Sequence, residues 1–433
     1  MYGSATLLIN EKVKSMWENG ENIYQLGFGE SRFPVHHLLA TALADNASKN
    51  SYVPLLGINE LRQKVSQFYN NHFNLITNEN QIIIGVGSKS LLYAVMYSIN
   101  GDVILPIPAW VSYKDQAELI GRRVVTFQLD STNGFKVSIS NLEKARQRAN
   151  PGPCMLVLTN PNNPTGTILS KHNVEEISQF CRENQIYILS DEIYSLLTHE
   201  GFSHTSPATY YPEGTIVLGG LSKILSLGGW RIGVAVVPDN HLGEMVIDGF
   251  CHVAGSIWSC VPAPLQHAAI TAYQENQKIT EFIQLCNSMH QIRTRYLYEQ
   301  LIAMGIPCNE PKGAFYIYPN FYPWAENLKS KGIQTDQDLS LHLLDHYEIA
   351  TLAGTEFLDS PGNYSIRMAT SYIDAENNIS VKNIVKAYQS NSDPQTFIQN
   401  HHPRLKAVIN RFCLLYTSDA ADDTPSVDLG GRR

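Results

Sequence analysis

Short apolar segments alternate with helical patterns along residues 81–237, and this alternation limits the possible folds more than any other feature. The expected strands are residues 81–86, 103–105, 123–129, 155–158, 186–189, 215–218 and 232–237. Helical patterns at residues 88–99, 110–119, 142–148 and 174–184 separate several of them. Strands that alternate with helices predict a mainly parallel sheet with helices on both faces.

The chain divides into regions on either side of this alternation. Residues 1–40 are expected to join a small α+β domain at residues 281–390, and residues 41–280 to form a large domain. Residues 391–413 carry no pattern that we can assign. Residues 414–433 contain few apolar residues and no periodicity, so we interpret them as translated sequencing read-through and exclude them from the fold.

Composition narrows the class of protein. The chain has 433 residues, with 43% apolar residues, 17% charged residues and a net charge of −8, which fits a globular protein of two domains. Without a dense basic run we expect no nucleic-acid partner. No segment has the roughly 18 unbroken apolar residues of a membrane span, and the N-terminus lacks a signal-peptide pattern. The seven scattered cysteines indicate reduced thiols and no metal site, so we expect a cytoplasmic protein.

A lysine and an arginine follow the expected strand at residues 215–218. Lys223 comes just after Gly219 and Gly220, and Arg231 comes eight residues later. Ligands of open α/β sheets bind outside the carboxyl ends of the strands. A desolvated lysine there can form a Schiff base, and the fork of an arginine suits a phosphate. These two residues indicate pyridoxal phosphate, although a surface lysine and arginine beside a loop would look the same.

Two further strand ends offer a phosphate site and a stacking ring. Ser88 and Lys89 open a helix directly after Gly87, where backbone N–H groups bind anions. Trp110 follows another strand and could stack on a planar ring. The alternatives are an ordinary strand-to-helix turn and a core tryptophan.

Two more strand ends offer polar partners for a pyridine ring. Asn163 lies in a loop stiffened by prolines and could donate to a phenolate oxygen, as could Tyr194. Asp191 closes the strand at residues 186–189 and could pair with a protonated ring nitrogen, or simply cap a helix. Taken together, five strand ends supply the groups that one pyridoxal phosphate molecule needs.

The motifs around these residues resemble those of the class I/II aminotransferases of fold type I, most closely the bacterial-type aspartate and aspartate/prephenate aminotransferases. The resemblance covers residues 4–388 and includes Asn162-Asn163-Pro164-Thr165-Gly166, Ser190-Asp191-Glu192-Ile193-Tyr194, Ser222-Lys223 with Gly229-Trp230-Arg231, Gly313-Ala314-Phe315-Tyr316 and Ser365-Ile366-Arg367. It implies an α/β fold with a mainly parallel seven-stranded sheet in the large domain. It also implies a homodimer with shared active sites.

The resemblance assigns roles to individual residues. Lys223 would carry the cofactor and act as general base, with Asp191 and Tyr194 as further catalytic groups. The cofactor-binding residues would be Tyr52 (from a neighbouring subunit), Ser88, Lys89, Trp110, Asn163, Asp191, Tyr194, Ser222, Lys223 and Arg231. The substrate-binding residues would be Gly29, Trp110, Asn163 and Arg367, with Arg367 on the α-carboxylate.

The implied activity is a two-step transfer of an amino group between an L-amino acid and a 2-oxo acid. We expect glutamate or aspartate as one donor, because a lysine at the position of Lys89 can meet a distal carboxylate in this family. The sequence Glu30-Ser31-Arg32 departs from the usual Glu-Pro-Asp and weakens the case for a strict aspartate enzyme, although Arg32 itself could favour an acidic side chain. The alternatives are a carbon–sulfur or other α,β-eliminating lyase and a pyridoxal-phosphate-binding regulatory protein.

Overall fold

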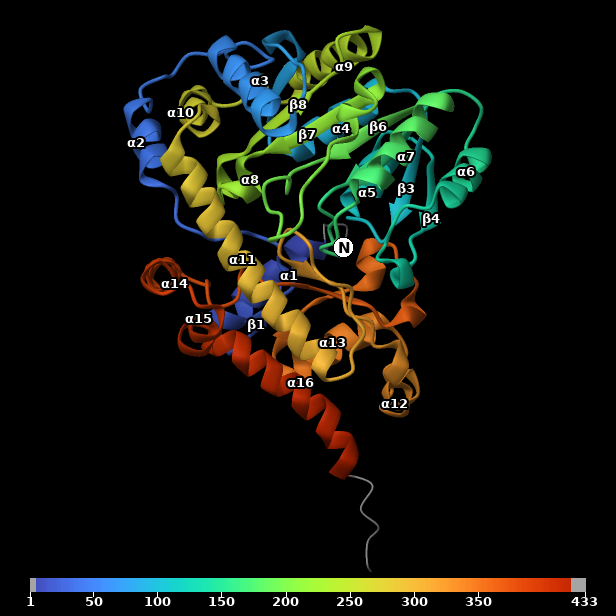
Figure 1. Cartoon of the computed structure of the whole chain (residues 1–433), viewed down its shortest axis with the longest axis vertical. Coiled ribbons are helices and arrows are strands. Elements are labelled where there is room, and N and C mark those ends of the chain that lie inside the picture. The colour runs from blue at the N-terminus through green and yellow to red at the C-terminus, as the bar shows by residue number, and fades with distance from the viewer. Residues whose placement is uncertain (1–4, 422–433) are drawn as a thin grey trace, which may run out of the picture.

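A mixed seven-stranded sheet forms the centre of the larger domain (Figure 1). The computed structural model describes residues 5–421, apart from the side chains of residues 5, 6, 414 and 416–421. The strands lie in the order β2-β8-β7-β6-β5-β3-β4. Their bounds are β2 Ile82–Val86, β3 Asp102–Ile107, β4 Val124–Gln128, β5 Cys154–Thr159, β6 Ile186–Asp191, β7 Thr215–Gly220 and β8 Ile232–Val236.

The predicted α/β class with a mainly parallel seven-stranded sheet is confirmed, with one reversal that the sequence did not reveal. Strand β8 runs antiparallel to both of its neighbours, β2 and β7, while the other pairs are parallel. The start of β8 therefore lies at the same edge as the ends of β2 and β7. This reversal brings Arg231, the residue before β8, to the edge where Lys223 lies.

Helices cover both faces of the sheet. Successive side chains of each strand point to opposite faces, and because both sets are apolar, both faces must be buried. Helices α4 (Ser88–Ser98), α5 (Ser112–Leu119) and α9 (His241–Ile257) pack on one face. Helices α3 (Asn59–Phe73), α6 (Ile139–Arg148), α7 (Lys171–Glu183) and α10 (Ala263–Tyr273) pack on the other. Such strands are buried on both sides, which explains why they read as unbroken apolar runs.

The smaller domain is built around the lower half of the long helix α11 (Gln277–Ala303), which runs down from the large domain (Figure 1). It holds a three-stranded antiparallel sheet of β11 (Leu352–Ala353), β12 (Ile366–Ala369) and β9 (Tyr316–Ile317). Helices α12 (Ala325–Ser330), α13 (Asp336–Tyr347) and α14 (Asn378–Ser390) complete it.

The N-terminal segment passes from the small domain to the large one. Helix α1 (Ala5–Glu18) is followed by β1 (Tyr24–Gln25), which pairs in parallel with β10 (Ile349–Ala350) of the small domain. The chain then crosses to α2 (His37–Asp45), which packs on α10. Residues 27–30, between these two anchors, therefore lie at the junction of the domains.

Two C-terminal helices occupy the region that we could not assign from the sequence. Helices α15 (Pro394–His401) and α16 (Pro403–Ala421) pack on α11 through buried side chains that include Phe397, Leu405 and Phe412. Helix α16 continues beyond residue 414, and Leu415 is only 3% exposed. Residues 1–4 and 422–433 lie outside the described part. The non-native origin of residues 414–433 remains a prediction.

Within residues 5–421, no helix combines the length and the apolar character needed to cross a bilayer.

Candidate active site

A cavity of about 460 Å³ opens where the carboxyl ends of the strands face the small domain. Asp191 ends β6, Lys223 follows β7, and Trp110 and Asn163 follow β3 and β5. The lining contains eleven of the twelve residues that we predicted from the sequence: Gly29, Ser88, Lys89, Trp110, Asn163, Asp191, Tyr194, Ser222, Lys223, Arg231 and Arg367. The twelfth, Tyr52, is 88% exposed and does not line this cavity.

Lys223 lies on the short helix α8 (Leu221–Ile224), with its amine directed across the cavity. Its Nζ donates a hydrogen bond of 2.5 Å to the carbonyl oxygen of Gly29. Burial lowers the pKa of Lys223 to about 8, although the Glu30 carboxylate opposes this effect. About a tenth of the amine is therefore uncharged at pH 7, far more than for an ordinary lysine, and the uncharged form is the one that acts as a nucleophile or a general base.

Asp191 is 4% exposed at the end of β6, and its carboxylate is held by two donors. Tyr113 Oη donates to Oδ2 at 2.7 Å, and the backbone N–H of Ile193 donates to Oδ1 at 3.3 Å. Burial raises the pKa of Asp191 to about 6, while these hydrogen bonds act in the opposite direction. A protonated pyridine nitrogen would complete the site, because each charge would favour the other.

Asn163 and Tyr194 line the cavity with polar groups that can meet an oxygen substituent. The Oη of Tyr194 lies 2.8 Å from the Oη of Tyr316, and both rings are buried. A Cβ at Gly29 would lie 2.2 Å from Tyr316 Oη, so only glycine lets the N-terminal segment approach this pair. Burial raises the pKa of Tyr194 well above its usual value, which keeps its proton available for donation.

The anion site combines a helix N-terminus with an arginine. A Cβ at Gly87 would lie 2.0 Å from Arg231 Nη2, and a Cβ at Gly233 would lie 2.4 Å from the backbone nitrogen of Ser88. These two glycines let the guanidinium and the first turn of α4 converge. A phosphate would meet both the positive end of the helix and the arginine fork.

Lys89 and Trp110 lie next to each other in the lining of the cavity. Lys89 Nζ lies 4.8 Å from the centroid of the Trp110 ring, a cation–π geometry. Burial and the nearby Arg231 lower the pKa of Lys89. The lysine is therefore neither fully solvated nor bound to a carboxylate among the described residues.

Arg367 lies on β12 and is 1% exposed. Its Nη1 donates to Asn163 Oδ1 at 3.3 Å and its Nη2 to the carbonyl oxygen of Gly27, while Nε has no partner although it is buried. A buried donor without a partner costs about 1–3 kcal/mol, and a carboxylate from a ligand would remove that cost.

Sequence reasoning missed Tyr113, Tyr316 and Glu30, all of which line the cavity. Tyr113 follows Trp110 by three residues within the helix expected at residues 110–119, and its ring packs edge-on against that of Trp110. This helical spacing was the available signal. Tyr316 and Glu30 belong to the motifs Gly313-Ala314-Phe315-Tyr316 and Glu30-Ser31-Arg32, but their positions in the cavity depend on the packing of the small domain.

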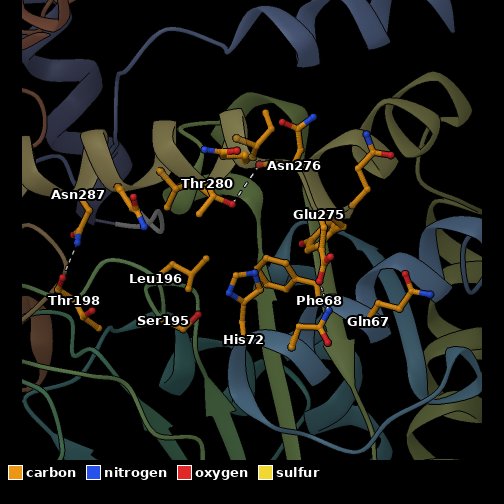
Figure 2. A pocket seen from close by; sticks show the side chains of 18 residues that line it. Gln67, Phe68, His72, Ser195, Leu196, Thr198, Glu275, Asn276, Thr280 and Asn287 are labelled. Carbon is orange, nitrogen blue, oxygen red and sulfur yellow. Dashed lines mark hydrogen bonds between the residues drawn. The ribbon is translucent and has the colours of Figure 1, made fainter.

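A second cavity of about 690 Å³ lies apart from this site, between α3 and the start of α11 (Figure 2). Its lining consists mainly of neutral polar side chains, and it contains none of the twelve predicted residues. Asn287 Nδ2 donates to the Thr198 carbonyl oxygen at 2.6 Å across one end of it. Among the described residues, no group of three or more His, Cys, Asp and Glu side chains could hold a metal ion.

The arrangement around Lys223 fits pyridoxal phosphate. The N-terminus of α4 with Arg231 suits the phosphate, the buried Asp191 suits a ring nitrogen, and Lys223 suits an aldehyde. The partnerless Arg367 Nε suits a substrate carboxylate.

Comparisons with known proteins point in the same direction. The family model described as aminotransferase class I and II matches residues 20–384. Aspartate aminotransferase of Geobacillus stearothermophilus is 32% identical over 377 residues, which cover 85% of this chain and 92% of that protein. Aspartate/prephenate aminotransferase of Thermus thermophilus is 29% identical over 376 residues, which cover 86% and 93%. A solved structure of aspartate aminotransferase from Thermus thermophilus with maleate matches with a TM-score of 0.77 and 27% identity, covering 90% of this chain and 97% of that one.

Proposed function

The chain belongs to the class I and II aminotransferases, a family of pyridoxal-phosphate-dependent enzymes, and we propose that the residues around Lys223 carry out its amino transfer. One observation carries this assignment of roles. A lysine with a pKa of about 8 and a buried aspartate stand at neighbouring strand ends, beside an anion site and a buried arginine.

Each part of the cavity would have one task in holding the cofactor. Arg231, Ser88 and Ser222 would bind the phosphate, and Trp110 would stack on the ring. Asn163 and Tyr194 would donate to the ring oxygen, while Asp191 would accept from the ring nitrogen. Bound pyridoxal phosphate supplies an electron sink for the charge that develops at the substrate Cα.

Lys223 would have two tasks in the reaction. It would carry the cofactor covalently between turnovers, and after release its Nζ would move a proton from the substrate Cα to the cofactor C4′. Arg367 would hold the substrate α-carboxylate through a bidentate pair, exchanging its contact with Gly27 for the ligand. The same groups would act in reverse on a 2-oxo acid, which gives a ping-pong cycle.

We propose glutamate or aspartate as one donor, because Lys89 lies beside Trp110 at the cavity wall. Arg32 does not contribute to this wall, since its guanidinium donates to Tyr372 Oη at 3.1 Å and lies 3.6 Å from Glu30. A desolvated lysine–carboxylate contact contributes about 1.5–3 kcal/mol. Lys89→Ala should therefore lower kcat/KM for the acidic donors by about 10- to 100-fold more than for neutral donors.

The test compares aspartate, glutamate, phenylalanine and alanine as donors in the wild type, in Lys89→Ala and in Lys114→Ala. Lys114 is a partly exposed lysine of the neighbouring α5 and serves as the control. An equal loss for all four donors in Lys89→Ala would assign the lysine to the cofactor and remove the argument for an acidic donor.

The comparisons do not favour the lyase or the regulatory protein that we kept as alternatives, since the relatives described above are named aminotransferases.

We infer a homodimer, because the exposed Tyr52 would reach the phosphate site of a second copy. We also infer a cytoplasmic role in amino-acid biosynthesis. Cys154, Cys181, Cys251, Cys260, Cys286 and Cys308 are free thiols, as a reducing compartment favours. Fractionation that places the protein in an oxidising compartment would contradict this inference.

A further inference from the structure

Helix α16 lies outside the part of the chain that the family model matches, yet it touches the segment that leads into the active site. Two arginines on this helix reach toward β1. Arg404 Nη1 donates to Asn22 Oδ1 at 2.7 Å, and its Nη2 donates to the carbonyl oxygen of Ile23 at 2.6 Å. The guanidinium carbons of Arg404 and Arg411 lie 4.6 and 4.4 Å from the centroid of the Tyr24 ring.

The helix itself is anchored at its start. Asp374 accepts hydrogen bonds from the backbone N–H groups of Arg404 at 2.9 Å and Leu405 at 3.0 Å. Arg404 Nε also donates to Glu376 Oε1 at 2.8 Å. Because the Glu376 carboxylate holds its Nε, the planar guanidinium of Arg404 has little freedom to rotate. Its Nη2 therefore holds the backbone at Ile23 in place.

The supported strand is continuous with the active-site segment. Tyr24 and Leu26 donate their backbone N–H groups to the carbonyls of Glu348 at 2.8 Å and Ala350 at 2.9 Å. The next residue, Gly27, accepts from Arg367, and Gly29 accepts from Lys223. Only Gln25 and Leu26 therefore lie between Tyr24, whose ring α16 contacts, and the Gly27 carbonyl, which accepts from the proposed substrate-binding Arg367.

We propose that Arg404 and Arg411 are positioning residues for amino transfer, which hold β1 so that residues 27–30 form the substrate wall at the correct distance from Lys223 and Arg367. This inference rests on the proposed function. A substrate carboxylate must replace the Gly27 carbonyl at Arg367, so the position of this segment decides how well the substrate competes. Loss of the support affects substrate binding more than the cofactor, because the anion site lies on the large domain.

The test uses full-length holoenzyme with Arg404→Ala, Arg404→Lys and Arg411→Ala, and Lys406→Ala as the control. Lys406 is on the same helix but donates to Gln399, away from β1. We expect Arg404→Ala to raise KM for the amino donor about tenfold while kcat changes less than about twofold and the cofactor absorption stays unchanged. Arg404→Lys should restore part of the loss, because it keeps the charge but not the fork.

Hydrogen exchange provides a readout that does not depend on activity. The amides of Tyr24 and Leu26 should exchange about tenfold faster in Arg404→Ala than in Lys406→Ala, with little change elsewhere in the small domain. Unchanged exchange at these two amides would overturn the inference whatever the activity, as would equal changes in kcat and KM. If Arg404→Ala does not fold, Arg411→Ala carries the same two measurements. If the wild-type protein shows no amino-transfer activity, the proposed function is wrong. The hydrogen-exchange rates of Tyr24 and Leu26 would still show whether Arg404 holds β1 in place.

Discussion

Asp191 shows how one buried residue can connect stability with chemistry. Its carboxyl group has an ordinary pKa of 3.8, and burial raises this to about 6 in the folded chain. An acid whose pKa is higher in the folded state makes folding less favourable as pH rises from about 4 to 6, because the unfolded chain releases its proton first. Above about pH 6 the penalty is constant. A shift of about two units corresponds to about 3 kcal/mol.

Asp191→Asn should therefore stabilise the cofactor-free protein at pH 7.5 relative to the wild type, by about 2–3 kcal/mol more than at pH 4. The same substitution should cripple removal of the Cα proton in the loaded enzyme, because the ring nitrogen loses its charged partner. Urea unfolding at several pH values measures the first effect, and single-turnover rates measure the second. A stability difference that does not vary with pH would contradict the raised pKa of Asp191. An unchanged single-turnover rate would show that Asp191 has only a structural role at the end of β6.

At the residue scale the sequence predicted the groups on strand ends and missed those that tertiary packing brings in. Asp191 ends β6, and Lys223 and Asn163 lie a few residues after β7 and β5, so their positions depend mainly on the parallel order of the strands. Tyr316 belongs to the small domain and reaches Tyr194 across 122 residues of sequence. No local pattern encodes a contact of that kind.

At the scale of elements, the predicted helices and strands of the large domain agree with the structure to within a few residues. The antiparallel direction of β8 could not be predicted, since an apolar run reads the same for either direction. The helices α15 and α16 were also missed. Their apolar residues, such as Phe397 and Leu405, are buried by contact with α11 more than 90 residues earlier in the chain, rather than by local packing.

The C-terminal boundary of α16 gives a prediction at the same scale. Leu415 is 3% exposed and packs in the core of the small domain, whereas residues 422–433 lie outside the described part. Removal of residues 422–433 should leave the melting temperature unchanged. Removal of residues 414–433 should lower it by about 1–4 °C, because burial of a leucine contributes about 2 kcal/mol.

Thermal melts of the two truncated proteins beside the full chain measure the difference, and activity at 25 °C serves as the control for folding. Equal melting temperatures for all three proteins would show that no residue after 413 contributes to stability, as expected for read-through sequence.

For the whole molecule, the exposed Tyr52 predicts an active site shared between two copies of the chain. Homodimers of Lys223→Ala and of Tyr52→Ala should both be impaired. A heterodimer of the two contains one site with an intact Lys223 and an intact Tyr52 from the other copy. A refolded equal mixture should recover about a quarter of the wild-type activity per subunit. Activity equal to the sum of the separate proteins would contradict a shared site.

A half-reaction measures whether Lys223 carries out amino transfer in this cavity. Holoenzyme is mixed with an amino donor in the absence of any 2-oxo acid. We expect each site to convert its cofactor once to pyridoxamine phosphate and to release one 2-oxo acid. Lys223→Ala should be slower by more than about a thousandfold. Continuous release of ammonia and a 2-oxo acid, with no change in the cofactor, would show elimination and rule out amino transfer at this site.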